Sequence, residues 1–195
     1  MLRSVSQTVM DNLEMVAAGF GLANIILIVR RSIWNYPFAL VMVTLYAIIF
    51  WEKKLYSDAG LQVFFFALNI YGWWCWGRNK ADTGQISVRR MKPLFFGAWM
   101  AFTLVAIMAW GQVMHELTDA SYPWWDASVA MLSVSGQILM TRRYIENWYY
   151  WIVVNILSIG LYHANGLSLT MILYGVFLMM AIWGLVTWRK AEARA

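Results

Sequence analysis

Long apolar runs separated by short charged segments dominate the pattern along this chain. A helix needs about 20 mainly apolar residues to cross a hydrocarbon core of about 30 Å. The runs predict helices over 13–29, 37–51, 59–76, 93–113, 125–140, 148–164 and 167–188. Pro37 and Pro93 stand at two predicted helix starts, where proline costs no hydrogen bond. The pattern therefore predicts an all-α integral membrane protein of seven transmembrane helices.

An internal repeat accompanies this pattern. The pair Arg30-Arg31 recurs as Arg142-Arg143, a shift of 112 positions, since 142 minus 30 is 112. Without a gap, the same shift pairs Ile33 with Ile145, Asn35 with Asn147, Val41 with Val153, Leu45 with Leu157, Phe65 with Phe177, Gly72 with Gly184 and Trp76 with Trp188. The matches predict two three-helix repeats, 13–76 and 125–188, joined by a linker helix over 93–113.

A single linker crossing would leave both repeats in the same orientation. Parallel repeats of this kind occur in transporters, whose substrate sites lie near the bilayer midplane at the repeat interface. The alternative is an old duplication that is retained only for packing.

Composition agrees with a membrane protein. Hydrophobic residues make up 62% of the 195 positions and charged residues only 13%, which is too apolar for a surface wetted by water. Seven spans with short loops use nearly the whole length, so one transmembrane transporter domain over 1–195 is expected.

The formal net charge of +5 would suggest nucleic acid in a soluble protein, but here the distribution of charge matters more. Twelve of the fifteen basic residues fall on one side of the predicted membrane: Arg30, Arg31, Arg78, Lys80, Arg89, Arg90, Lys92, Arg142, Arg143, Arg189, Lys190 and Arg194. The positive-inside rule then places the C-terminus in the cytoplasm and the N-terminus outside. No nucleic-acid partner is expected.

Polar residues within the spans are candidates for function, because hydrocarbon tolerates them poorly. Amides within the spans or at their edges include Asn24, Gln62, Asn69, Gln137, Asn147 and Asn155, and the spans hold no deeply placed Lys, Arg, Asp or Glu. Proton- or sodium-coupled carriers usually keep a buried carboxylate. The pattern therefore favours passive, uncoupled transport.

The amides form stripes with tryptophans at helical spacing. Gln62, Asn69 and Trp73 share one face of their helix, with Trp76 one turn further on. Asn147, Trp151 and Asn155 recur at intervals of four, and Gln137 lies on the preceding helix.

Amides bond hydroxyls and carboxamides, whereas indole faces attract planar and cationic rings. We therefore expect both stripes to line one cavity, for a neutral or cationic aromatic ring that carries a polar arm. The alternative is that the tryptophans form interfacial belts and the amides bridge helices.

Other chemistries have little support. One cysteine, Cys75, and two histidines, His115 and His163, are a poor basis for a metal site, and no cofactor is expected. Neither a nucleophile elbow nor a pair of carboxylates is present, so an enzyme is not expected.

Two segments, 61–76 and 137–155, resemble the PnuC family of vitamin transporters. The likeness runs from about Trp34 to Lys190. It includes the pair Trp73-x-x-Trp76 and the run Glu146-Asn147-Trp148-x-x-Trp151-x-x-x-Asn155, which adds Trp148 to the expected substrate-binding residues.

The resemblance implies facilitated uptake of nicotinamide riboside across the bacterial inner membrane. Net uptake would depend on a cytoplasmic vitamin kinase that traps the product as a phosphate ester. It also implies a SWEET-like arrangement of three, one and three helices, and assembly as a homotrimer. Thiamine or another nucleoside-like vitamin is the alternative substrate. A membrane scaffold or channel subunit without a ligand is the alternative from another class.

Overall fold

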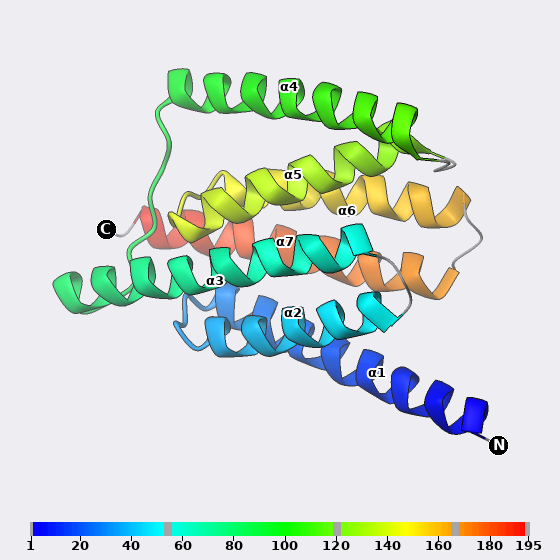
Figure 1. The fold of residues 1–195 in the computed structure, drawn as a ribbon. Coiled ribbons are helices and arrows are strands. Elements are labelled where there is room, and N and C mark those ends of the chain that lie inside the picture. Colours follow the sequence, from blue (N-terminus) through cyan, green and yellow to red (C-terminus); the bar gives the residue numbers. More distant parts are fainter. Residues whose placement is uncertain (1, 53–55, 119–121, 165–167, 194–195) are drawn as a thin grey trace. The chain divides into compact units, whose positions relative to one another are not determined.

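The computed structural model describes residues 2–52, 56–118, 122–164 and 168–193. These ranges hold seven α-helices (Figure 1): α1 (Leu2–Val29), α2 (Asn35–Glu52), α3 (Tyr56–Thr83), α4 (Pro93–Leu117), α5 (Pro123–Thr141), α6 (Asn147–Ala164) and α7 (Ser168–Glu192). Within them the extended structure is limited to one isolated bridge between Arg89 and Tyr144. The expectation of an all-α protein is confirmed.

The helix boundaries differ from the apolar runs most at two places. α1 begins at Leu2 rather than near 13, and α3 continues to Thr83 rather than ending near 76. The extension of α3 carries Arg78, Lys80 and Asp82, which are exposed. Hydrophobicity marks where a helix meets hydrocarbon, whereas the helix itself continues for as long as its backbone hydrogen bonds form.

Three of the helices described are long and apolar enough to cross a membrane, over Asn12–Val29, Pro93–Leu117 and Met171–Glu192. A shorter apolar stretch covers Asn35–Ile49 in α2. The remaining helices mix apolar residues with tryptophan, tyrosine and amide side chains, which lowers their mean hydropathy.

The chain divides into two compact units, Met1–Ile86 and Ser87–Ala195. In the first, α2 packs against both α1 and α3 (Figure 1). In the second, α5 packs against α4 and α6, and α6 packs against α7 (Figure 1). Each unit therefore holds one of the two predicted three-helix segments, and α4 belongs to the second unit.

α1 and α5 end in the same way. After α1, the Ser32 N–H donates to Leu27 O (2.9 Å) and the Arg31 N–H to Ile28 O (2.9 Å). After α5, the corresponding bonds join Tyr144 N to Leu139 O (3.0 Å) and Arg143 N to Met140 O (2.8 Å). This is the Schellman pattern, with an arginine at the left-handed position that glycine usually takes: φ is 55° at Arg31 and 63° at Arg143.

Aromatic packing also recurs at the shift of 112. Tyr36 meets Trp76 edge-on at 5.4 Å in the first unit, and Trp148 meets Trp188 edge-on at 5.5 Å in the second. A Cβ added at Gly72 would lie less than 3.0 Å from the Tyr36 ring, and one at Gly184 equally close to the Trp148 ring. Glycine is required at both positions because an aromatic ring lies directly on the helix backbone.

Candidate substrate-binding site

Asn147, the first residue of the stripe on α6, makes a hydrogen bond within the protein. Asn147 is fully buried, and its side-chain amide donates to the Tyr144 carbonyl at 2.6 Å. Asn35 does the same in the first unit, donating to Ser32 O at 2.7 Å. Both asparagines hold the turn that precedes their helix, which is a structural role. The Asn147 carbonyl oxygen is buried without a partner among the described residues.

The last residue of the stripe differs. Asn155 is 5% exposed and hydrogen-bonds to no other described residue. Ser158 lies three residues further along α6, on the same face, and is completely buried. Its hydroxyl has no partner in the described part of the chain. Sequence analysis missed Ser158 because it counted amides and indoles only; its spacing from Asn155 was the available signal.

Trp151 lies one turn before Asn155 and is half-buried. It faces Gly136 of α5, where an added Cβ would lie 3.5 Å from the indole Nε1. The next residue of α5, Gln137, is 6% exposed. The structure therefore brings the end of α5 and the middle of α6 together within the second unit, with an indole where they meet.

Trp148 has a packing environment. Its ring contacts Trp188 and covers Gly184 of α7, and it is 2% exposed. The indole Nε1 is buried without a partner among the residues described. The contacts to Trp188 and Gly184 pack the ring inside the second unit, so its position favours a structural role over direct binding.

The residues expected on α3 also fall into two groups. Asn69 is 3% exposed and donates to Phe65 O of its own helix at 2.9 Å, and Trp76 is buried against Tyr36. Trp73 is 40% exposed, and Gln62 is partly exposed. The α3 residues belong to the first unit and the α6 residues to the second.

A buried hydroxyl cluster in the second unit was not anticipated. Thr103 of α4 lies 2.9 Å from the Ser135 hydroxyl of α5 and 3.4 Å from the Tyr150 hydroxyl of α6. Thr103 also bonds Trp99 O at 2.9 Å. These hydroxyl groups link α4, α5 and α6 by hydrogen bonds. In the sequence, the cluster was indicated only by the presence of hydroxyl residues within apolar runs.

The connection between the units carries the charged contacts. Arg31 donates to Ile86 O (3.0 Å), and the Arg143 Nε donates to Ser87 O (3.1 Å). Glu146 is 7% exposed and accepts the Met91 N–H at 3.1 Å. It is the only buried carboxylate among the side chains that the structure describes. It directly precedes Asn147, the first residue of α6, and lies nine residues before Asn155.

Among the described residues, no three His, Cys, Asp or Glu side chains cluster. The arrangement on α6 offers carboxamide and hydroxyl groups beside an indole. Such a surface can bind a polar ring compound through hydrogen bonds and stacking.

Comparison with known proteins gives one consistent result. The sequence model of the nicotinamide mononucleotide transporter family matches residues 11–190. The nicotinamide riboside transporter PnuC of Escherichia coli is 32% identical, over 90% of this chain and 84% of its own. The PnuC of Neisseria mucosa is 31% identical, over 93% of this chain and 73% of its own.

Two further similarities bear on fold and substrate. A crystal structure of the vitamin B3 transporter PnuC superimposes with a TM-score of 0.76 and 28% identity, covering 93% of this chain and 82% of its own. The riboflavin/roseoflavin transporter RibM of Streptomyces davaonensis is 28% identical, over 90% of this chain and 83% of its own. Relatives at similar distances thus carry different vitamins.

Proposed function

This chain belongs to the nicotinamide mononucleotide transporter family, and on that premise we propose that it carries nicotinamide riboside across the cell membrane. Members of the family are membrane transporters and not enzymes. Sequence relatives of 31% and 32% identity over most of the chain are named for nicotinamide riboside, which supports this substrate over others.

The observation that carries the site proposal is a buried polar pair on α6: Asn155 hydrogen-bonds to no described residue, and the Ser158 hydroxyl is buried without a described partner. A buried polar group without a partner costs about 1–3 kcal/mol, and a ligand that bonds to it recovers that energy. Nicotinamide riboside has ribose hydroxyls and a carboxamide for these groups. Its positively charged pyridinium ring suits the face of Trp151.

The other expected residues take different parts in the proposed site. Gln137 is a second buried amide of the second unit and follows Gly136, which Trp151 faces. Trp73 and Gln62, on α3 of the first unit, keep exposed surface and stay predictions from the sequence. Asn69, Trp76, Asn147 and Trp148 act through packing, since each has internal contacts that its burial requires.

We propose that transport is facilitated diffusion. Glu146, the buried carboxylate of the described part, precedes the first turn of α6, where its Oε1 accepts the Met91 N–H and its Oε2 has no described partner, so it stands at the edge of the predicted span and not within it. Net uptake would then come from phosphorylation of the vitamin by a cytoplasmic kinase, which removes free substrate from the inner side.

The proposed topology has two parallel three-helix repeats joined by α4, in a bacterial inner membrane, with the N-terminus outside and the C-terminus in the cytoplasm. Three features that recur at a shift of 112 support a duplication. They are the hydrogen bonds that end α1 and α5, the edge-on aromatic pairs, and the asparagine bonds before α2 and α6. The basic residues between spans support the orientation. A homotrimer is the proposed assembly.

Uptake into proteoliposomes tests the function. We expect saturable entry of labelled nicotinamide riboside, with competition by the unlabelled compound. Thiamine and riboflavin are the comparison substrates, the latter because RibM is a relative. Preferential entry of either would reassign the vitamin within the family. Lack of entry of all three would favour the scaffold or channel alternative.

A further inference from the structure

The loop after α5 pairs with an extended segment of the chain. Arg89 N–H donates to Arg143 O (2.9 Å), and Ile145 N–H donates to Arg89 O (2.9 Å). These two bonds form a parallel bridge that flanks Tyr144. The Arg143 carbonyl and the Ile145 N–H, two residues apart, therefore form a short open strand edge. This edge binds one residue of extended backbone, here Arg89.

The same edge exists in the first unit, where no described residue pairs with it. The shift of 112 relates Arg143 O to Arg31 O and Ile145 N to Ile33 N, and both loops follow the same left-handed arginine. Neither Arg31 O nor Ile33 N has a hydrogen-bond partner among the described residues. Both residues line a hollow of about 260 Å³ within the first unit.

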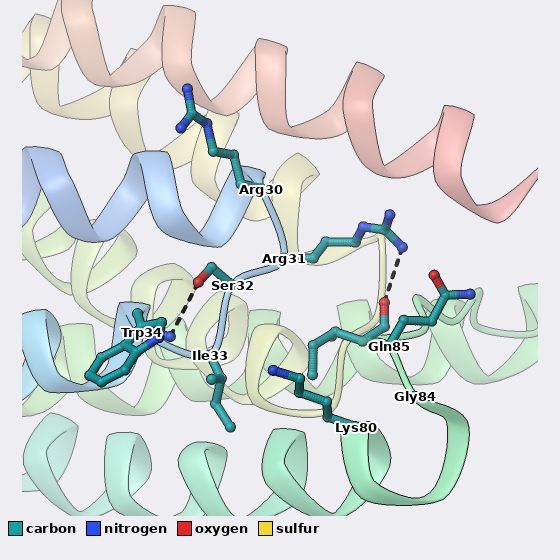
Figure 2. Close-up of a pocket in the computed structure, with 9 residues that line it drawn as sticks. Arg30, Arg31, Ser32, Ile33, Trp34, Lys80, Gly84 and Gln85 are labelled. Carbon is teal, nitrogen blue, oxygen red and sulfur yellow. Dashed lines mark hydrogen bonds between the residues drawn. The ribbon is translucent and has the colours of Figure 1, made fainter.

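Figure 2 shows this hollow. The Arg31 guanidinium turns aside to the Ile86 carbonyl, and the Lys80 side chain reaches toward the loop of Ser32 and Ile33. The volume lies below the roughly 300–1,000 Å³ of small-molecule pockets. A short extended segment suits this space better than a whole vitamin.

Charge distinguishes the two edges. In the second unit the occupying segment is basic: Glu192 pairs with Arg90 at 3.0 Å. The residue 112 positions before Glu192 is Lys80, since 192 minus 112 is 80. Lys80 makes no ion pair with a described residue. Lys80 in the first unit thus takes the place of Glu192 in the second. The edge formed by Arg31 and Ile33 should therefore attract an acidic segment, where the edge of the second unit binds a basic one.

We propose that the edge formed by Arg31 and Ile33 docks an extended peptide segment of a partner protein, with an acidic side chain directed at Lys80. The binding mode is addition of a strand to an open edge. A phosphate group is disfavoured because it acts mainly as a hydrogen-bond acceptor and does not match the spacing of the Arg31 carbonyl and the Ile33 N–H, whereas one residue of extended peptide supplies both a donor and an acceptor. The proposed topology places this face in the cytoplasm.

Peptide binding to the purified full chain in detergent tests the proposal and involves no vitamin. Fluorescence polarisation would compare a short labelled peptide of alternating valine and glutamate with its lysine counterpart. We expect saturable binding of the glutamate peptide only. Lys80→Glu, which copies the second unit, should reverse the preference. Arg78→Glu is the matched control, because it changes the net charge equally on an exposed position of α3 outside the hollow.

A second arm tests the backbone pairing. Methylation of the peptide nitrogen that faces Arg31 O should weaken binding roughly twofold to tenfold, the value of one hydrogen bond. Unchanged affinity after methylation, or full displacement by inorganic phosphate, would identify an anion site and overturn the proposal. Failure of both peptides to bind, or loss of preference in Arg78→Glu alone, would overturn it as well.

Discussion

At the scale of single residues, amides that look equivalent in the sequence have different roles. Asn147 and Asn69 satisfy carbonyl groups within their own units, at 2.6 Å and 2.9 Å. Asn155 and Ser158 are as deeply buried, but no described residue bonds to them. Burial alone therefore does not separate packing from binding; the difference is that the side chains of Asn155 and Ser158 make no hydrogen bond to any described residue.

Trp151→Ala should weaken binding of nicotinamide riboside. Loss of the stacking surface costs roughly 1–3 kcal/mol by analogy with base–aromatic stacking, which is about a tenfold to hundredfold change in affinity. Isothermal titration of the detergent-solubilised protein measures it. Ile156→Ala is the control, since Ile156 is 53% exposed on the same helix. Equal effects of the two substitutions would place the binding site elsewhere.

Asn155→Leu and Asn147→Leu should separate affinity from stability. Asn155→Leu removes a proposed ligand contact but no protein hydrogen bond, so affinity should fall while the midpoint of thermal unfolding is maintained. Asn147→Leu removes the bond to Tyr144 and should lower stability by about 0.5–1.5 kcal/mol. Thermal unfolding and titration of both variants give the comparison. A stability loss confined to Asn155→Leu would assign that amide to packing.

At the scale of helices and loops, the close approach of aromatic rings to glycines determines how neighbouring helices pack. Trp148 of α6 lies directly on Gly184 of α7, and Tyr36 of α2 lies on Gly72 of α3. The left-handed arginines after α1 and α5 reverse the chain into the next helix. The ring-on-glycine contact and the left-handed arginine both recur in the two units. The corresponding helices of the two units therefore pack and connect in the same way.

Gly184→Ala should destabilise the second unit. The added methyl group would overlap the Trp148 ring, and overpacking of this kind typically costs about 1–3 kcal/mol. The midpoint of thermal unfolding should fall accordingly. Gly175→Ala in the same helix is the control, because nothing lies within 4 Å of its added Cβ. There the substitution should be neutral or stabilising, since glycine in a helix costs roughly 0.5–1 kcal/mol relative to alanine. A larger loss at Gly175 would contradict the packing described.

At the scale of the whole molecule, the chain belongs to a family of membrane transporters and its charge distribution determines the proposed orientation. Twelve of its fifteen basic residues occupy the segments on one side of the predicted spans. The same segments contain the Lys80 hollow and the arginine contacts to Ile86 and Ser87.

A reporter fused after Ala195 should be active only in the cytoplasm, because the positive-inside rule places the basic segments there. Paired fusions to alkaline phosphatase and to green fluorescent protein measure the location. Phosphatase activity at this position would reverse the proposed orientation.

Uptake should continue when proton and sodium gradients are collapsed, because no carboxylate is placed on the α6 stripe to carry a coupling ion. Proteoliposomes treated with ionophores provide the measurement, and exchange of labelled for unlabelled vitamin is the readout. Uptake that stops with the gradient would show a coupled carrier, and the role of Glu146 would then need a new explanation.

The sequence by itself determined the helical class, the start of α4 at Pro93 and the recurring positions 112 residues apart, because hydrophobicity and backbone propensity act locally along the chain. It also contained the motifs that indicate the family. Only the tertiary structure decided which buried polar atoms are already paired. That property depends on atoms distant in sequence: Thr103 meets Ser135 and Tyr150, Glu146 meets Met91, and Asn155 meets no described partner.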